Sequence, residues 1–550
     1  MTEPWWKKSV IYQIYPQSFK DHNGDGIGDL PGILEKLDYL EAMGIDVIWI
    51  GPIFQSPLID NGYDISDYYR VNPIYGTDED LDQLIEEAGR RGIKIILDLV
   101  INHCSDQHAW FQMALQEPDS EEAGYFYFMK TDSGEAPNNW RSNFGGPAWT
   151  QTADGRWYLH TFSKEQPDLN WENPKLRRKL YDMINWWLDK GIGGFRVDAI
   201  TFIKKDTTFA SRETEEGRLY PIENYQNYPG IGTFLTELKQ ATFQKFNCLT
   251  VGEAPGVPPE KFGDYAGEDG YFSMIFDFSW EHMRGVEIKG APEAVSAWRD
   301  KIFKSQMQIQ QAGWSANFLE SHDHPRSPNK FLDKQNRSRE SITTLATLYF
   351  FLRGTPLIYQ GQELGMTNTV RNSIREFKDV SAHNFWKEGL ALGKSDAEML
   401  KELNDIGRDN GRSPFQWNRM EHAGFTSGTP WMPVHSDYQT VNAEEAQADD
   451  NSILAYYKKM IKLRKNSDWS DVLCFGSFNP ILEQYPSLIA YRRSYKGRTL
   501  TIVCNMSSES VKLPVQVETC LLTNQSDLHL EGENLILNPY QSMVLEESSL

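Results

Sequence analysis

The sequence predicts an α/β fold: a (β/α)₈ barrel with a subdomain inserted after the third strand and an antiparallel β-sandwich domain at the C-terminus. Three observations lead to this prediction. A unit of amphipathic helix, glycine and short apolar strand repeats along the chain, which is typical of βα alternation around a parallel sheet. The chain contains apolar runs that would form about eight buried strands. The tail instead alternates short β-type runs with turns.

The repeated unit occurs three times. It is found in LPGILEKLDYLEAMG before DVIWI, in TDEDLDQLIEEAGRRG before KIILDLV, and in NPKLRRKLYDMINWWLDKG before GGFRVD. Apolar residues at helical spacing give each helix a buried face, Thr77 and Asn173 are suitable N-caps, and a glycine ends each helix. The apolar runs that complete about eight strands, the number that closes a TIM barrel, lie near residues 10, 248, 272, 315 and 355.

The predicted barrel is interrupted once. Residues 104–172 are rich in Trp, Asn and Gly and are too many for an ordinary βα loop, so we expect an inserted subdomain at the barrel mouth. Residues 1–103 and 173–469 then form the barrel, with an irregular polar region after the eighth strand and a helix near 451–465. Residues 470–550, with the runs SLIAYRRS, RTLTIVCN and SMVLEE, are assigned to the C-terminal β domain.

Composition disfavours several classes of partner. The formal net charge of −22 argues against nucleic acid and anionic membrane surfaces, because both repel an acidic protein, and favours a neutral or cationic substrate. No window approaches the apolar run of a membrane span, and the start MTEPWWKKSV lacks a secretory signal, so we expect a cytoplasmic protein. The five cysteines are odd in number and widely spaced, which favours reduced thiols over disulfides or zinc.

Polar side chains follow several predicted strands, at the end where barrel enzymes place their chemistry. They are Asp98, Asn102 and His103 after the third strand, Arg196 and Asp198 on the fourth, Glu253 after the fifth, and Glu320, His322 and Asp323 after the seventh. A structural salt-bridge cluster would explain one or two of them but not the whole set. Two carboxylates flanking a bond, with a third nearby, are what glycoside hydrolysis requires.

The segment GGFRVDAI suggests roles within this set. Arg196 and Asp198 share one face of a strand because they are two residues apart. A positive charge lowers the pKa of a neighbouring carboxyl, so Arg196 would keep Asp198 ionised as a nucleophile. Glu253, leaving an apolar strand, would stay protonated and act first as general acid and then as base. A buried ion pair that merely satisfies itself is the alternative.

Several blocks of the chain resemble glycoside hydrolase family 13, the α-amylase superfamily. Its four motif regions are similar to DLVINH (98–103), GFRVDAI (194–200), VGEA (251–254) and SHD (321–323), in this order. QPDLN (166–170) resembles the extra motif of the subgroup of oligo-1,6-glucosidases and α-glucosidases. The opening WWKKSVIYQIYPQSF and the segment RDNGRSPFQW (408–417) are similar too, so the resemblance covers nearly the whole chain.

The resemblance implies a role for each matching residue. Asp198 is the expected nucleophile, Glu253 the acid/base, and Asp323 the third carboxylate, which holds the 2- and 3-hydroxyls of the sugar and helps to distort its ring. His103 and His322 would hydrogen-bond the sugar, and Arg196 would orient the nucleophile.

The resemblance also implies a closed pocket. Asp64 in NGYDISDY and Arg412 in NGRSPFQW would grip the 4-hydroxyl end, so that the pocket ends behind a single glucose. Phe144 and Phe162 would either stack on sugar faces or pack the small core of the inserted subdomain. The implied activity is that of an exo-acting α-glucosidase that releases glucose from the non-reducing end with retention of the α configuration.

Ala199 bears on the linkage that is cleaved. In the subgroup that the chain resembles, the residue after the nucleophile is often valine in α-1,6-cleaving enzymes and alanine in those that favour α-1,4 bonds. We therefore expect an α-1,4-glucosidase acting on maltose and malto-oligosaccharides, with an oligo-1,6-glucosidase (isomaltase) or a sucrose-active, isomerising enzyme as the alternative. Sucrose isomerases of the subgroup carry an arginine-rich loop where this chain reads HPRSPNKFLDK, which disfavours isomerisation as the main reaction. Hydrolysis of trehalose 6-phosphate is also disfavoured, because it would require a phosphate-binding cationic site and the sequence indicates none.

The stretch DHNGDGIGD is a candidate metal site. Its oxygens come from Asp21, Asn23, Asp25 and Asp29 and from the carbonyl of Ile27, at the spacing of the first nine EF-hand positions, but Gly32 stands at the twelfth. The resemblance implies a structural Ca²⁺ (or Mg²⁺) here, away from the chemistry. An Asx-rich turn without an ion is the alternative. No organic cofactor is expected.

Two further classes of function stay open. A non-catalytic, glucosidase-like scaffold is disfavoured because Asp198, Glu253 and Asp323 are all present. A metal-dependent barrel enzyme would use the same carboxylates to bind Mg²⁺ instead of a sugar. The expected partner is a small oligosaccharide, and the chain is expected to be a monomer or a weak homodimer.

Overall fold

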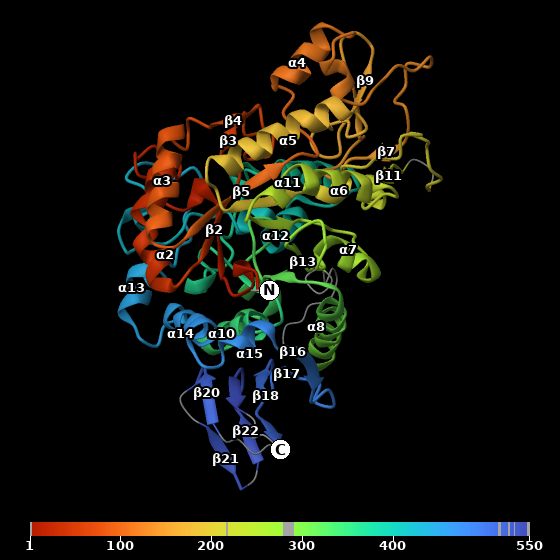
Figure 1. The fold of residues 1–550 in the computed structure, drawn as a ribbon. Helices are drawn as coiled ribbons and strands as arrows, with labels where there is room; N and C mark the ends of the chain where they lie inside the picture. Colours follow the sequence, from red (N-terminus) through yellow and green to blue (C-terminus); the bar gives the residue numbers. More distant parts are fainter. Residues whose placement is uncertain are drawn as a thin grey trace.

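A closed barrel of eight parallel strands forms the centre of the computed structural model, as the sequence predicts (Figure 1). The structure describes residues 3–215, 218–278, 291–514, 519–525, 528–532 and 534–546. The barrel strands follow one another in chain order: β1 (Ile11–Ile14), β2 (Val47–Ile50), β5 (Lys94–Val100), β10 (Gly194–Asp198), β12 (Leu249–Gly252), β13 (Met274–Phe276), β14 (Ser315–Asn317) and β15 (Thr355–Tyr359). Each lies within one of the predicted apolar runs.

The helices between the strands begin and end largely where their capping residues predict. Thr77 and Asp80 form a reciprocal capping box at the start of α3 (Asp78–Arg90), and Asn173 caps α5 (Pro174–Asp189). The first predicted helix is instead divided into α1 (Leu30–Glu35) and α2 (Leu37–Met43), because Lys36 between them has φ −106° and ψ 8°.

Other helices complete the outer layer and the region after the barrel. They are α6 (Ile231–Ala241), α7 (Phe262–Ala266), α8 (Pro292–Ala312), α9 (Ser327–Phe331), α10 (Arg339–Phe350), α14 (Ile453–Asn466) and α15 (Ser470–Phe475). The predicted helix near 451–465 corresponds to α14. The barrel interior is filled by apolar side chains such as Trp49, Val251, Met274 and Phe276, so the barrel is a packed core and not a pore.

The inserted segment between β5 and α5 has its own small fold. It contains α4 (Ala109–Gln116) and an antiparallel sheet of β6 (Phe128–Met129), β9 (Trp157–Leu159) and β8 (Trp149–Gln151). A further strand, β7 (Trp140–Arg141), pairs in parallel with β11 (Tyr220–Pro221), which follows β10 in the chain. The segment after the fourth barrel strand therefore also joins this subdomain, which the sequence did not predict.

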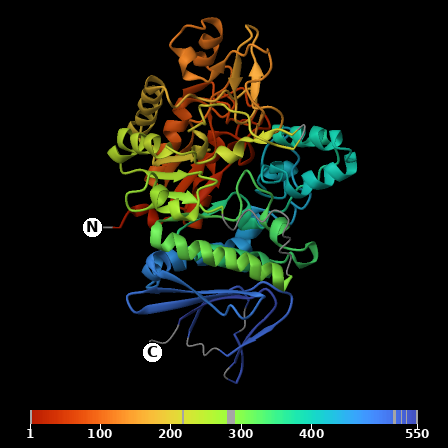
Figure 2. The ribbon, with the colours of Figure 1, turned by 90° about the vertical axis from the view of Figure 1, so that its right-hand side faces the viewer.

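The polar region after the eighth strand contains a helical hairpin. Its helices are α11 (Val380–Ala391) and α12 (Asp396–Ile406), which project from one side of the barrel in Figure 2. A short helix, α13 (Ala443–Ala448), precedes α14. Near the start of the chain, β3 (Phe54–Gln55) and β4 (Asp67–Val71) form a small antiparallel pair.

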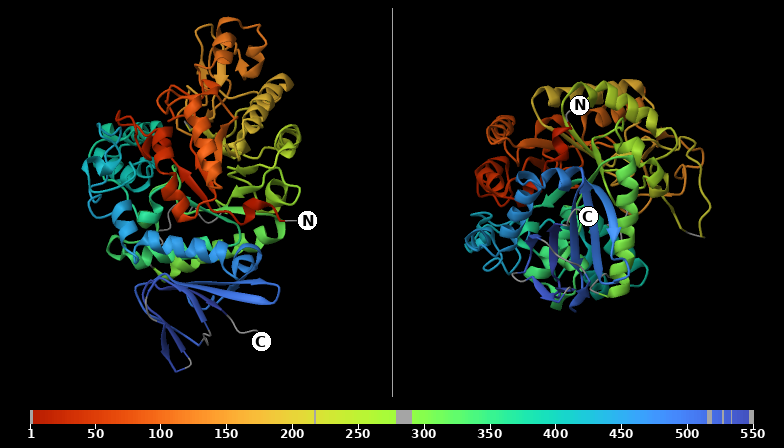
Figure 3. Two further views of the ribbon diagram at one scale, coloured as in Figure 1. Left: turned by 60° about the vertical axis from the view of Figure 1, so that its left-hand side comes forward. Right: turned by 60° about the horizontal axis from the view of Figure 1, so that its bottom comes forward.

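The C-terminal residues form two antiparallel sheets. One has the order β16–β17–β18–β23–β20 and the other β19–β22–β21. Their bounds are β16 (Ser477–Ile481), β17 (Leu488–Tyr495), β18 (Arg498–Asn505), β19 (Val511–Leu513), β20 (Thr519–Thr523), β21 (His529–Glu531), β22 (Asn534–Leu537) and β23 (Ser542–Glu546). The five-stranded sheet packs beneath α8 and α10, and both sheets lie at the opposite end of the molecule from the inserted segment (Figures 1 and 3).

Two general features complete the fold. All five cysteines are unpaired. Within the part of the chain that the structure describes, no helix combines the length and apolar character that crossing a bilayer requires.

Candidate functional site

One arginine lies at the centre of the charged cluster at the carboxyl ends of the barrel strands. Arg196 Nη1 is 2.6 Å from Asp98 Oδ1 and 2.7 Å from Asp198 Oδ1, and its Nη2 is 2.8 Å from Glu253 Oε2. The sheet register produces this arrangement, because Arg196 pairs directly with Asp98 across β10 and β5, and Glu253 follows β12 on the other side. Three carboxylates therefore share one buried guanidinium.

Burial and the shared Arg196 guanidinium act in opposite directions on the pKa values of Asp98 and Asp198. Burial raises the pKa of Asp98 to about 6 and raises that of Asp198 well above its ordinary value, while the Arg196 guanidinium acts in the opposite direction on both. Arg196 acts on Asp198 in the predicted direction, but its one positive charge does not outweigh burial and two neighbouring carboxylates, so the predicted lowering of the Asp198 pKa is not found. Asp98 and Asp198 therefore retain a proton to a higher pH than free aspartates would.

The surroundings of Glu253 differ from the expectation of an apolar setting. Besides Arg196, its Oε2 accepts the backbone N–H of Ala199 at 2.8 Å. Ala199 has φ 44° and ψ 34°, in the left-handed region that few non-glycine residues adopt, and this conformation aims its amide at the carboxylate. The Glu253 side chain is 21% exposed and is the most accessible of the three around Arg196.

His322 links this cluster to Asp323. Its Nε2 lies 2.5 Å from the Tyr63 hydroxyl and 3.1 Å from Asp323 Oδ2, and its Nδ1 is 2.7 Å from Gln13 Nε2. The Tyr63 hydroxyl also donates to Asp98 Oδ2 at 3.1 Å. Burial holds the pKa of His322 well below its ordinary value, so the imidazole is neutral.

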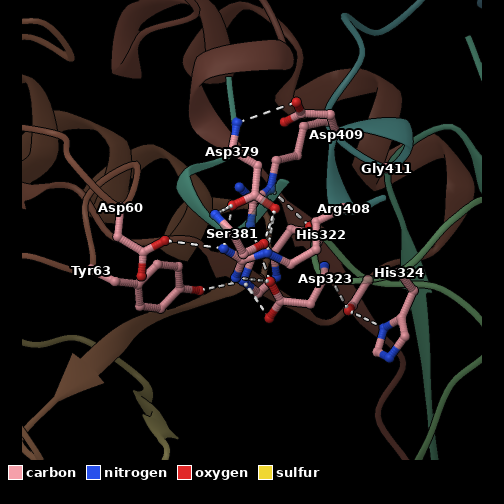
Figure 4. Close-up of polar contacts among 12 residues, drawn as sticks. Asp60, Tyr63, His322, Asp323, His324, Asp379, Ser381, Arg408, Asp409 and Gly411 are labelled. Atoms are coloured by element: carbon pink, nitrogen blue, oxygen red, sulfur yellow. Dashed lines mark hydrogen bonds and ion pairs between the residues drawn. The ribbon is translucent and has the colours of Figure 1, made fainter. Parts of the chain in front are cut away.

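Asp323 is held ionised by two arginines, of which Arg408 is labelled beside it in Figure 4. Arg408 Nη1 and Arg412 Nη2 both lie 3.1 Å from its Oδ1. Burial opposes ionisation, but neighbouring positive charge outweighs it, and the pKa of Asp323 is below its ordinary value. Because His322 is neutral, we attribute this charge stabilisation to the arginines.

Arg408 occupies the position that was predicted for Arg412. It begins a short 3₁₀ turn, and its Nη2 contacts Asp60 Oδ1 at 3.3 Å and Asp379 Oδ1 at 2.6 Å, as Figure 4 shows. The Arg412 side chain is fully buried, and its Nε donates to the carbonyl of His322. Arg412 thus supports the wall of the site, and the arginine that reaches its open side is Arg408.

Asp60 likewise occupies the position that was predicted for Asp64. The Asp64 carboxylate accepts hydrogen bonds from Ser56 Oγ at 2.9 Å and from the amides of Ile59 and Asp60 at 2.8 and 3.1 Å, so it shapes its own loop. Asp60 instead meets Arg408 and accepts from Gln166 Nε2 at 3.1 Å. Burial raises the pKa of Asp60 to about 6 against the opposing charges of Arg408 and Arg412.

The remaining predicted residues lie beside this group. His103 Nε2 is 3.2 Å from both the Tyr63 carbonyl oxygen and Gln166 Nε2, and burial lowers the pKa of His103 to about 4. The Phe162 ring is 5.0 Å from the His103 ring and 5.3 Å from that of Phe144. Both phenylalanines therefore lie at the site and not in the separate core of the inserted segment.

Sequence reasoning missed five residues of the network. They are Asp60, Tyr63, Gln166, Asp379 and Arg408. Three of them belong to motifs already quoted, Tyr63 to NGYDISDY, Gln166 to QPDLN and Arg408 to RDNGRSPFQW, and Asp60 comes directly before the first of these. Asp379, in the irregular region, carries no sequence signal.

The candidate metal loop lies apart from the charged cluster. Asp21 accepts the amides of Gly24 and Gly26 at 2.7 and 2.8 Å, and Asp29 caps α1 by accepting from Gly32 N at 2.7 Å. These are the contacts of an Asx-rich turn, although carboxylate and amide oxygens in this number also fit a hard cation such as Ca²⁺. Among the residues that the structure describes, no group of three or more His, Cys, Asp or Glu side chains is arranged to hold a metal ion.

Comparison with known proteins places this geometry in a family. The alpha-amylase catalytic-domain model matches residues 13–471. An oligo-1,6-glucosidase of Halalkalibacterium halodurans is 42% identical over 566 aligned residues, which cover 99% of each chain. The solved trehalose-6-phosphate hydrolase of Bacillus licheniformis is 39% identical with a TM-score of 0.90, and the trehalulose synthase of Pseudomonas mesoacidophila 36% identical with a TM-score of 0.93; each alignment covers 99% of this chain and 100% of the other.

Proposed function

The chain belongs to the alpha-amylase family, glycoside hydrolase family 13, in the oligo-1,6-glucosidase subgroup, and we propose that it is an exo-acting, retaining α-glucosidase whose main substrates are short α-1,6-glucosides. One observation carries the proposal: Asp198, Glu253 and Asp323 surround one site whose far side is occupied by the Arg408–Asp60 pair. The α-1,6 assignment follows the relatives, which are named oligo-1,6-glucosidase and align over 99% of this chain.

The proposed reaction has two steps. Asp198 attacks the anomeric carbon while Glu253 donates a proton to the glycosidic oxygen, so the bond to the aglycone breaks and a glycosyl ester with Asp198 forms. Glu253, now a carboxylate, takes a proton from water, whose oxygen attacks the same carbon and releases glucose and the free Asp198 carboxylate. Both carboxylates contact terminal nitrogens of one guanidinium, and this closeness favours retention over inversion.

The shared cluster supplies the proton for the first step. Because burial raises the pKa values of Asp98 and Asp198, these two carboxylates hold a proton to a higher pH than free aspartates do. Glu253 has the most accessible of the three carboxyl groups around Arg196, so it is the one that can present that proton to a leaving group. Transfer of the proton to Glu253 leaves Asp198 ionised for attack.

Exo action follows from the Arg408–Asp60 pair in this proposal. Arg408 offers N–H donors and Asp60 offers acceptors, which together suit a terminal sugar hydroxyl. Asp323, ionised by Arg408 and Arg412, would accept hydrogen bonds from two adjacent hydroxyls of the same glucose. The neutral His103 and His322 can donate or accept without adding charge, which suits an uncharged substrate.

An α-1,4 preference is the second candidate, favoured by Ala199. The deciding experiment measures initial rates of glucose release from isomaltose, maltose, sucrose, trehalose and trehalose 6-phosphate, with Asp198→Asn as the inactive control. We expect isomaltose to lead by tenfold or more, about 1.4 kcal/mol in transition-state free energy. A lead for maltose would favour the Ala199 interpretation, formation of a sucrose isomer would indicate an isomerase, and no turnover at all would overturn the glucosidase proposal.

A further inference from the structure

A loop of the inserted segment is fastened to helix α11 by a single carboxylate. Glu388 Oε2 lies 2.7 Å from Nη2 of Arg141, and Glu388 Oε1 accepts the backbone N–H of Gly146 at 3.0 Å. Gly145, with φ +97°, lies between these two contacts, and a Cβ there would come within 2.5 Å of Glu388 Oε1. Glycine at this position therefore allows the carboxylate to reach both partners. We call Glu388 with Arg141 and Gly146 the latch.

The latched loop, residues 141–146, is itself a tight turn with a firm base. Ser142 Oγ donates to the carbonyl of Phe162 at 2.6 Å, the Asn143 amide donates to the carbonyl of Thr161 at 2.8 Å, and the Ser142 amide donates to the carbonyl of Gly146 at 2.9 Å. The loop thus holds its shape against the subdomain. The latch additionally fixes the position of this loop relative to α11, on the other side of the site.

Phe144, at the tip of this loop, meets Arg408. The Arg408 guanidinium carbon is 4.9 Å from the centroid of the Phe144 ring, a cation–π contact, and the ring also packs against Phe162. Asp379, the N-cap of α11, holds the same arginine through contacts of 2.6 and 2.9 Å. One helix therefore fixes Arg408 at its first turn and the Phe144 loop near its end.

We propose that Glu388 is a positioning residue that latches the 141–146 loop across the end of the pocket formed by Arg408 and Asp60, and so limits the pocket to one terminal glucose. This inference rests on the proposed function and names what enforces its exo action. The Arg141 and Glu388 side chains are 32% and 39% exposed, so their ion pair is weak and screened by salt. Such a contact can open to release glucose and close on the next chain end.

Product analysis tests the latch. Wild type and Glu388→Ala act on isomaltotetraose and maltotetraose labelled at the reducing end, and the first labelled product is identified at low conversion. We expect wild type to yield only the labelled trisaccharide, and Glu388→Ala to yield labelled disaccharide or monosaccharide as well, because the loop that carries Phe144 no longer closes the pocket beside Arg408. The KM for the preferred disaccharide should rise at least fivefold while kcat changes less than twofold.

Matched variants separate the latch from general damage. In the same helical hairpin, Glu402 Oε1 lies 2.8 Å from Lys394 Nζ in an exposed ion pair. Glu402→Ala removes this pair and should leave the products and KM unchanged. Arg141→Ala should behave like Glu388→Ala, and the double variant should add little to either. Glu388→Gln, which can still accept the Gly146 amide, should be intermediate. Wild type in 1 M NaCl should shift towards the Glu388→Ala product pattern.

Two results would overturn the latch. One is a Glu388→Ala enzyme that makes wild-type products with wild-type KM; the other is hydrogen exchange at the Gly146 amide that is equally slow in wild type and Glu388→Ala. The exchange measurement needs no turnover. If wild type hydrolyses none of the sugars, the proposed function fails, while faster exchange at Gly146 in Glu388→Ala would still show that the carboxylate fastens the loop.

Discussion

Ala199 couples a strained backbone to the chemistry of its neighbour. At φ 44° its amide points to Glu253, and a β-branched side chain is strongly disfavoured in this region. Ala199→Val should therefore lower the free energy of unfolding by about 1–2 kcal/mol. Thermal unfolding measures this effect.

Glycine provides the control at this position. Ala199→Gly keeps the amide and removes the steric cost, so it should unfold at the wild-type temperature or higher and retain kcat. A valine variant as stable as wild type would show that the left-handed conformation of Ala199 is not required.

Glu363 is a buried carboxyl remote from the proposed reaction. Its Oε1 accepts the hydroxyls of Tyr12 and Tyr39 at 2.7 and 2.8 Å, and its Oε2 has no hydrogen-bond partner. Burial raises the pKa of Glu363 from 4.5 to about 7. The folded chain thus holds a proton that the unfolded chain loses above pH 4.5, so stability falls as pH rises from 4.5 to 7 and stays lower above that.

Glu363→Gln removes this dependence, because the amide has no proton to lose. Relative to wild type, the variant should gain up to about 3 kcal/mol of unfolding free energy between pH 5 and pH 8. Denaturant unfolding of both proteins at the two pH values measures the change. The pH-dependent difference is the readout, since the amide itself adds a constant cost at both values. A stability gap that does not change with pH would contradict the raised pKa of Glu363.

We expect the carboxylates around Arg196 to control the fall in rate on the acid side of the pH–rate profile. The pKa values of Asp98 and Asp198 are raised by burial, so protonation that removes the nucleophile begins at a higher pH than for a free aspartate. We expect kcat/KM to fall as pH decreases through the raised pKa of Asp198, at a higher pH than a free aspartate would give. Trp49→Phe, which removes a 3.0 Å hydrogen bond to Asp98, should move this limb upward.

Unfolding at low pH would also lower kcat/KM, so the folded state must be measured separately at each pH. Melting temperatures of both proteins at pH 5 show whether the chain stays folded where the rate has fallen. A limb near pH 4 in wild type, with the fold intact, would contradict the raised pKa values of the cluster.

The site shows how far residue-level prediction reaches. The catalytic carboxylates could be named because each ends or follows a barrel strand, where backbone direction fixes where side chains go. The residues proposed to bind the end of the substrate could not be named in the same way. Asp60 and Asp64 lie in one loop, as Arg408 and Arg412 lie in one segment, and only the hydrogen bonds made by each turn decide which member of the pair faces the site.

At the scale of elements, the loop 21–29 supports the polar region after the barrel. Asp21 is 2% exposed and accepts Thr426 Oγ1 as well as two amides of its own loop. The Asp21 amide donates to the Phe425 carbonyl and the Trp431 amide donates to the Gly26 carbonyl, both at 3.0 Å. This pairing fixes the segment 425–431 against the loop that follows β1.

Asp21→Ala should therefore destabilise the fold by about 2–4 kcal/mol, because it leaves buried amides without an acceptor. Asp25, whose carboxylate is exposed, makes only local turn contacts, and Asp25→Ala should cost less than about 1 kcal/mol in a calcium-free buffer. Melting temperatures in EDTA measure both variants. Equal losses would contradict the support that we assign to Asp21.

The same variants test the proposed structural ion. If Ca²⁺ binds between Asp21, Asn23, Asp25, Asp29 and the Ile27 carbonyl, adding it to EDTA-treated wild type should raise the melting temperature, and Asp25→Ala should lose that gain. Wild type that melts at the same temperature with and without Ca²⁺ would favour the Asx-rich turn without an ion.

Elements were predictable where one physical rule dominates. Strands buried on both faces read as continuous apolar runs, and helices read from their caps and buried faces, which is why the barrel could be predicted. The pairing of β7 with β11 and the hairpin of α11 and α12 could not be. Short polar strands and helices have weak local signals, and their places depend on contacts such as that between Arg141 and Glu388, distant in the sequence.

At the scale of the whole molecule, the two additions to the barrel lie at opposite ends. The inserted segment contributes Phe144, Phe162 and Gln166 to the site. The five-stranded C-terminal sheet instead packs against α8 and α10 on the far side (Figure 1). The composition of the tail predicted a separate β domain, but not which helices it covers. The division suggests that the first addition shapes specificity and the second supports stability.

Arg493 on β17 offers a direct test of that division. Its side chain is fully buried, and it donates to the carbonyls of Phe351 at 2.6 Å and Gly476 at 2.9 Å, which joins the C-terminal sheet to the end of α10. Arg493→Met keeps an apolar chain but leaves these carbonyls without a donor, so it should cost about 2–4 kcal/mol of unfolding free energy. Lys512→Ala, which removes an exposed pair with Glu531, is the matched control. Below its lowered melting temperature, Arg493→Met should retain wild-type kcat/KM. A loss of kcat/KM in the folded variant would instead show that the C-terminal sheet acts on the site through the barrel.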